Sequence, residues 1–85
     1  MDIVKGTVVI SKAGRDKGRM LAVLGLENDI AIVADGDLRK IERPKRKKVK
    51  HLSLTKTVFD QSVLVSNKLL RESIEKIKSA KEEGY

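Results

Sequence analysis

This chain has 85 residues, of which 40% are hydrophobic and 36% charged, and its formal net charge is +7. A chain of this length forms one small domain with room for an appended helix. It contains no cysteine, which excludes disulfides, thiolate catalysis and cysteine-based metal sites. Its apolar runs fall short of the roughly 20 residues that span a bilayer, and its first residues lack the apolar core of a signal peptide. We therefore expect a cytoplasmic protein without a membrane segment.

Five short segments predict β-strands, because they are rich in aliphatic and β-branched residues and are separated by turn signals. The predicted strands are residues 6–11, 20–26, 30–34 and 38–42, followed by a fifth in which Val49, His51, Leu52 and Leu54 alternate. The turn signals include Glu27-Asn28-Asp29 and Asp35-Gly36-Asp37. Five short strands with frequent turns indicate a mainly β fold, a small closed or half-closed antiparallel barrel.

After about residue 57 the apolar residues recur with a helical period. The apolar face consists of Phe59, Val63, Leu69, Leu70, Ile74 and Ile77. This pattern predicts an amphipathic C-terminal helix of about five turns, with Asp60 and Ser66 as alternative N-caps. Its apolar face needs a partner, either the barrel or another protein. We divide the chain accordingly into a barrel over residues 1–56 and a helix over residues 57–85.

The positive charge is concentrated in two blocks. Residues 12–19 carry a net charge of +3 and residues 39–54 a net charge of +7, whereas residues 20–38 carry −4. A solvated surface mixes its signs more evenly, so charge segregated in this way favours a polyanionic partner.

The first basic block is SKAGRDKGR, which connects the first two predicted strands. Its two glycines permit backbone turns that a Cβ would forbid, and they let a phosphate approach the main chain. Arginine offers phosphate a planar fork, and lysine a mobile point charge. The candidate RNA-binding residues of this loop are Lys12, Gly14, Arg15, Lys17, Gly18 and Arg19. The alternative interpretation is an ordinary surface hairpin whose charges serve solubility.

The second basic block contains RPKRKKVK at residues 43–50. Because it lies between predicted strands, we expect a loop that projects from the barrel with its side chains in solvent, rather than a disordered arm or a nuclear-localisation-like signal. Its candidate RNA-binding residues are Arg43, Lys45, Arg46, Lys47 and Lys48. Such contacts go mostly to phosphates and give affinity with little sequence readout. The alternative is a solvated charged loop.

The segment GTVVISKAGRDKGRMLAV at residues 6–23 resembles the KOW motif, which several ribosomal proteins and transcription elongation factors share. Gly14, Lys17 and Gly18 occupy the motif's glycine and Lys-Gly positions. The D-G turn, basic segment and K-H-L strand within residues 33–55 are similar to the archaeal and eukaryotic large-subunit ribosomal proteins numbered fourteen and twenty-seven. The resemblance implies an SH3-like β-barrel that contacts ribosomal RNA through the loop between its first two strands and through nearby basic segments.

The sequence offers no arrangement of residues that indicates catalysis. His51 is the only histidine and alternates with apolar residues, so we expect it to pack or to form a hydrogen bond. Asp16 lies between two cations and is expected to organise the loop, while Asp35 and Asp37 flank a glycine as turn residues. The segment AGRDKG lacks the spacing of a GxxxxGKS or GxxxxGKT loop, and one histidine without cysteine argues against a zinc site. We expect no enzyme, cofactor, metal or small-molecule substrate.

Three functional hypotheses follow, in decreasing order of preference. The first is an RNA-binding module, ribosomal or ribosome-associated, that contacts structured RNA. The chain has only one Phe and one Tyr, and therefore lacks the aromatic platform on which single-strand binders stack bases. The second is a protein-interaction module that holds a ribosomal or transcription-complex protein. The third is a small basic barrel that coats duplex DNA.

Overall fold

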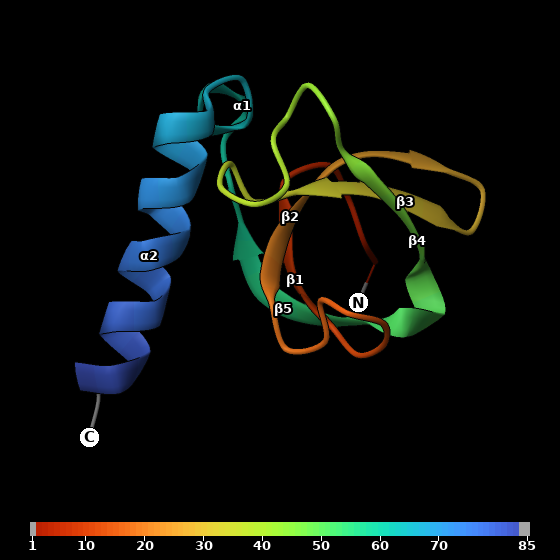
Figure 1. Ribbon diagram of the computed structural model, residues 1–85, viewed down its shortest axis with the longest axis horizontal. Coiled ribbons are helices and arrows are strands. Elements are labelled where there is room, and N and C mark those ends of the chain that lie inside the picture. The colour runs from red at the N-terminus through yellow and green to blue at the C-terminus, as the bar shows by residue number, and fades with distance from the viewer. Residues whose placement is uncertain (1, 84–85) are drawn as a thin grey trace.

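The computed structural model describes residues 2–83 and is mainly β, with one long helix beside a curled sheet (Figure 1). The elements in chain order are β1 (Thr7–Ser11), β2 (Met20–Glu27), β3 (Ile30–Ala34), β4 (Lys45–Lys48), the 3-10 helix η1 (Val49–His51), β5 (Leu52–Val58), α1 (Gln61–Leu64) and α2 (Asn67–Glu83). The first three strands fall where the aliphatic runs predict them.

The five strands form one antiparallel sheet in the order β4-β3-β2-β1-β5. Its two edge strands, β4 and β5, are joined only by the three residues of η1. In a flat sheet these edges would lie four strand spacings of about 4.8 Å apart, whereas three 3-10 residues advance only about 6 Å. The sheet must therefore curl until its edges approach each other (Figure 1).

The structure corrects the prediction for the second basic block. Residues 38–42 form no strand, and the basic run itself is the edge strand β4, which pairs with β3 from Val33↔Lys45 to Ile30↔Lys48. Lysine is a common residue on edge strands, because its charge discourages pairing with another chain. The prediction of a projecting loop at residues 45–48 is wrong for this reason.

The end of the sheet also differs in detail from the prediction. His51 lies in η1 and is exposed, so it does not alternate along a strand. The last strand continues to Val58. The proposed boundary between residues 56 and 57 therefore falls inside β5.

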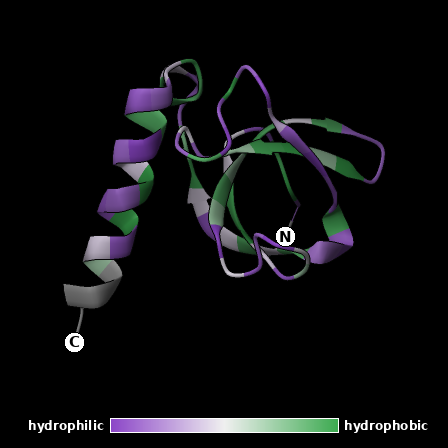
Figure 2. Cartoon of the chain, in the orientation of Figure 1, coloured by the Kyte–Doolittle hydropathy of each residue, from purple (hydrophilic) through white to green (hydrophobic). Residues whose placement is uncertain are grey.

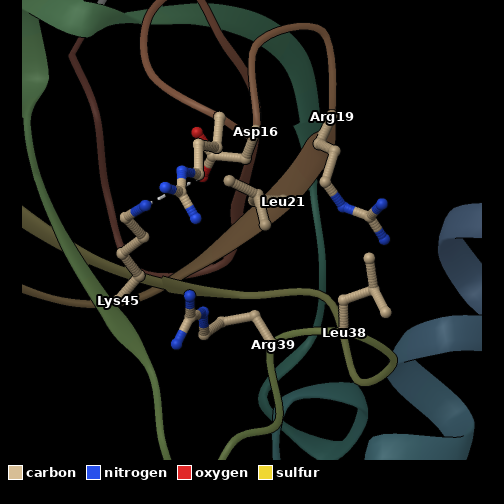
Figure 3. Close-up of a pocket in the computed structure, with 7 residues that line it drawn as sticks. Asp16, Arg19, Leu21, Leu38, Arg39 and Lys45 are labelled. Atoms are coloured by element: carbon tan, nitrogen blue, oxygen red, sulfur yellow. Dashed lines mark ion pairs between the residues drawn. The ribbon is translucent and has the colours of Figure 1, made fainter.

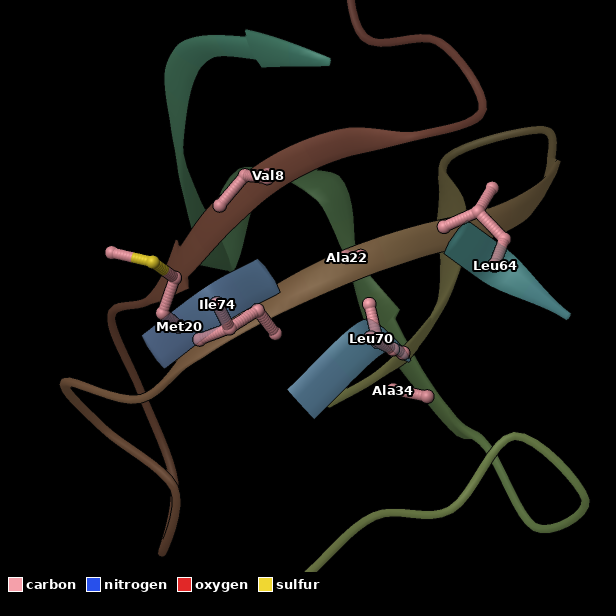
Figure 4. Packing of buried hydrophobic residues seen from close by; sticks show 7 residues of the cluster. All are labelled: Val8, Met20, Ala22, Ala34, Leu64, Leu70 and Ile74. Atoms are coloured by element: carbon pink, nitrogen blue, oxygen red, sulfur yellow. The ribbon is translucent and has the colours of Figure 1, made fainter. Parts of the chain in front are cut away.

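Two apolar clusters cover the two faces of the sheet. One lies on the face that α1 and α2 cover (Figure 4) and consists of Val8, Met20, Ala22, Ala34, Leu64, Leu70 and Ile74. The other fills the opposite, concave face and consists of Val9, Leu21, Val23, Ala31, Val33 and Leu52. Both faces are apolar because the strands are aliphatic at successive positions rather than only at alternate ones.

The C-terminal segment forms two helices rather than one. Asp60 caps α1 by accepting a hydrogen bond from the amide of Ser62 (3.0 Å), and Ser66 Oγ accepts one from the amide of Leu69 (3.2 Å) at the start of α2. Both predicted caps are therefore used, one for each helix. Neither helix in residues 2–83 is long and apolar enough to cross a bilayer.

The predicted apolar face of α2 packs against the chain's own sheet. Leu70 and Ile74 are buried against it, while Leu69 is 46% exposed and so lies off that face. The hydropathy of the ribbon shows the same division, with the apolar side of α2 turned toward the sheet and the polar side away from it (Figure 2). The helix thus completes the core instead of remaining free for a partner.

Candidate nucleic-acid interface

The loop between β1 and β2, residues 12–19, is held by its own backbone. Gly14 and Gly18 have φ values of +85° and +90°, in the left-handed region that favours glycine. The amide of Gly18 donates to the carbonyl of Ser11 (2.8 Å), and the amide of Arg19 donates to the carbonyl of Asp16 (2.9 Å). Because the loop is already ordered, a ligand that binds it loses little conformational entropy to ordering.

A largely buried ion pair ties this loop to β4. Lys47 Nζ donates to Asp16 Oδ1 (2.6 Å) and to the carbonyl of Ala13 (2.8 Å). The side chains of Lys47 and Asp16 are only 7% and 15% exposed. Lys45 Nζ lies 3.8 Å from the other oxygen of Asp16. The two basic blocks, separated in the sequence by an acidic segment, therefore meet in space.

The carboxyl of Asp16 is kept ionised by these neighbours. Burial by itself raises the pKa of Asp16, but the hydrogen bonds from Lys47 and Ser11 and the charges of Lys47 and Lys45 lower it further, so that the pKa lies below its ordinary value of 3.8. This agrees with the expectation that Asp16 organises the loop.

A second carboxylate organises the loop that follows β3. One oxygen of Asp35 accepts hydrogen bonds from Arg19 at 2.7 and 3.1 Å, and the other accepts from the amides of Asp37 and Arg39 at 2.9 Å each. Burial raises the pKa of Asp35, but these hydrogen bonds and the charge of Arg19 outweigh it and hold the pKa below 3.8. Arg19 is thereby neutralised within the protein.

The two depressed pKa values predict a specific loss of stability in acid. A carboxyl whose folded-state pKa lies below its unfolded value contributes stability that is present above the unfolded pKa and is lost as the pH falls through the folded pKa. We expect the free energy of unfolding to fall as the pH drops below 3.8, the ordinary value for both groups. Urea unfolding between pH 7 and pH 3 should show a shallower fall for Asp35→Asn. An unchanged pH dependence in that variant would contradict this assignment.

The structure divides the predicted cations into two sets. Lys47 corrects the prediction that residues 45–48 all face solvent: side chains alternate along β4, so Lys45 and Lys47 share the face of their buried partners on β3. Arg19 is bound to Asp35, and Arg46 pairs with Glu27. In the described part of the chain, the predicted cations that are exposed and have no carboxylate within ion-pair distance are Lys12, Arg15, Lys17, Arg43 and Lys48.

A pocket of about 290 Å³ opens where the two basic blocks meet. Its lining residues are Arg15, Asp16, Arg19, Leu21, Leu38, Arg39 and Lys45. Figure 3 shows Lys45 reaching toward Asp16 on one side, Arg19 and Leu38 on the other, and Leu21 between them. Asp16 is the only acid among the lining residues, so the pocket favours an anion.

Sequence reasoning missed Arg39 and Leu38 as site residues because it assigned them to a strand. They lie instead in the loop that Asp35 organises between β3 and β4. Pro44 was the available signal: proline is confined to edge strands or to the first residue of a strand, and here it stands immediately before the edge strand β4.

No protein-family model matches this chain, and no curated protein matches it. Within residues 2–83, no group of three or more histidine, aspartate or glutamate residues lies close enough together to hold a metal ion. The functional argument therefore depends on the residues of the site.

Proposed function

We propose that this chain is a non-enzymatic RNA-binding protein, ribosomal or ribosome-associated, that contacts the phosphates of structured RNA through the loop 12–19 and the adjoining basic residues. The observation that carries the proposal is the meeting of the two basic blocks around one pocket. Two internal carboxylates fix the scaffold, and further cations remain exposed around it. A rigid cationic surface of this kind suits a phosphate backbone.

The distribution of aromatic residues supports structured RNA rather than a single strand. Proteins that bind single strands without sequence preference stack bases on exposed aromatic side chains. Among the described residues the only aromatic is Phe59, which is partly buried and packs against the core cluster under α2. Folded RNA, which proteins recognise largely by shape and by phosphate contacts, does not require such a platform.

A small SH3-like antiparallel barrel of the KOW type belongs to the same proposal. The strand order and the short η1 link between the edge strands support a nearly closed sheet. The glycine-hinged basic loop joins β1 and β2, where the resemblance to KOW proteins places the RNA contact. The chain would then act in the cytoplasm, on or beside the ribosome.

The double substitution Arg15→Gln/Lys17→Gln tests the proposal. Both side chains are exposed loop cations, so the fold should survive. Losing two phosphate contacts removes the release of about two counterions, which weakens binding roughly 25- to 60-fold at 0.1 M salt. Fluorescence anisotropy with a labelled, folded fragment of ribosomal RNA measures this change.

The matched control is Lys68→Gln/Lys76→Gln, which removes the same charge from exposed positions on α2. It should weaken binding far less than the loop variant. Equal losses in the two variants would mean that net charge, rather than this site, governs affinity. Absence of RNA binding by the unchanged protein would reject the proposal in favour of a protein-interaction module.

A further inference from the structure

The rim of the pocket contains an apolar side chain that the fold does not use. Leu38 is 73% exposed, although it stands among cations in the loop between β3 and β4. It is the most exposed large hydrophobic residue in the described part of the chain, and it belongs to neither core cluster. Phosphate contacts alone give no reason for a leucine at this position.

The pocket combines an apolar floor with a cationic rim. Leu21, which is 2% exposed, and Leu38 supply the apolar surface, while Arg15, Arg39 and Lys45 supply positive charge. At about 290 Å³ the pocket is at the lower end of the roughly 300–1,000 Å³ typical of small-molecule sites. A double helix cannot enter such a space, whereas a single planar ring system with its attached phosphate matches both its size and its chemistry.

We propose that this pocket receives one unpaired nucleotide that projects from a folded RNA, such as the nucleotide of a single-base bulge. This inference rests on the proposed RNA-binding function and deepens it. The base lies against Leu38 and Leu21, and the phosphates on either side of it contact the cations of the rim. The loop 12–19 then supplies general affinity for the backbone, and the pocket supplies preference for an unpaired position.

Arginine takes over the stacking that aromatic residues provide in other RNA-binding proteins. Splayed bases stack on guanidinium planes as well as on aromatic rings. The side chains of Arg15 and Arg39 are exposed, and neither lies within ion-pair distance of a carboxylate in residues 2–83. Both guanidinium groups are therefore available to a base.

Three RNA hairpins that differ at one position provide the test. The first carries a single unpaired nucleotide, the second is fully paired, and the third carries an abasic residue at the bulge, which keeps the phosphate and the backbone distortion but removes the base. We expect the unchanged protein to bind the bulged hairpin roughly tenfold more tightly than either of the others, the range expected for one stacked base.

The variant Leu38→Ser should abolish this preference and leave affinity for the fully paired hairpin unchanged, because the leucine is exposed and carries no charge. Leu69→Ser, at another exposed leucine outside the pocket, is the matched control and should keep the preference. Arg39→Gln provides a second test of the pocket and should reduce the preference for the bulge more than it reduces binding to the paired hairpin.

Several results would overturn the inference. Salt-dependent binding of all three hairpins with equal affinity would reject the nucleotide pocket while leaving the proposed function intact. A preference that survives in Leu38→Ser would place the recognition elsewhere. Displacement of the paired hairpin by micromolar adenosine 5′-monophosphate would assign the pocket to free nucleotides instead of RNA. Failure of every hairpin to bind at low salt would reject the proposed function together with the inference.

Discussion

Gly36→Ala is expected to cost about 3 kcal/mol or more of the roughly 4–13 kcal/mol that stabilises a chain of this size. Gly36 has a φ of +77°, where a Cβ introduces strain of about 1–2 kcal/mol. A Cβ would also collide with the carbonyl oxygen of Asn67 and lie 3.1 Å from the amide nitrogen of Arg71, both in the first turns of α2. The loop or the helix would have to move.

The position matters because the loop and α2 are joined there. The amide of Ile41 donates to Asn67 Oδ1 (2.8 Å), and Asn67 Nδ2 donates to Glu42 Oε1 (2.6 Å). Displacing α2 would therefore weaken these hydrogen bonds as well as the packing of Leu70 beneath it. Urea unfolding at pH 7 measures the loss.

Gly18→Ala is the matched control for this prediction. Gly18 has a similarly positive φ of +90°, but a Cβ there would have no heavy atom within 4 Å. Only the conformational strain of about 1–2 kcal/mol remains. Equal destabilisation by the two substitutions would show that contact between Gly36 and α2 has no energetic importance.

Lys47→Met should destabilise the protein by about 2–4 kcal/mol, because it leaves the Asp16 carboxylate with too few partners. The substitution removes the ammonium that donates to Asp16 and to the carbonyl of Ala13, and the replacement has a similar length. Asp16 retains Ser11 and the more distant Lys45, so the loss should be somewhat smaller than for a fully isolated buried charge. Urea unfolding at pH 7 measures it.

The neighbouring Lys48→Met is the control, because Lys48 is exposed on the same strand. Exposed substitutions of this kind usually change stability by less than about 0.5 kcal/mol. A second check is the double variant Asp16→Asn/Lys47→Met, which should lose less stability than the sum of its two single changes. Additive losses would mean that the two side chains act independently.

Much of the fold could be predicted from local sequence, because its first three strands are marked by aliphatic residues and by turns. The turn residues Asn28 and Gly36 both adopt positive φ, as their positions in the turn signals suggest. The caps Asp60 and Ser66 were also recognisable, since side-chain oxygens at helix starts accept from the amides that follow. These features depend on only a few neighbouring residues.

The identity of β4 could not be predicted in the same way. Four consecutive cations have poor local preference for a strand, and they form one here because β3 needs a partner on its open edge. That requirement is tertiary. It also determines which of the cations face inward, so the burial of Lys47 follows from its register opposite Ala31 and not from its own chemistry.

The candidate site was predicted in part for the same reason. Composition placed positive charge in two blocks, but it could not show that Asp16 and Asp35 neutralise Lys47 and Arg19. Nor could it bring Leu38 and Arg39 to the loop 12–19, because that contact depends on the path of the chain between β3 and β4. The sequence indicates the chemistry of the surface, and the tertiary fold selects the residues that carry it.

The salt dependence of binding between the unchanged protein and a folded fragment of ribosomal RNA tests the central claim most directly. If about five cations each neutralise a phosphate, log K should fall with log salt at a slope of roughly −3.5 to −4.5. A slope in that range, measured by anisotropy between 50 and 200 mM salt as in roughly the interval used for such analyses, would support an electrostatic RNA interface. A slope near zero, or no binding at the lowest salt, would contradict it.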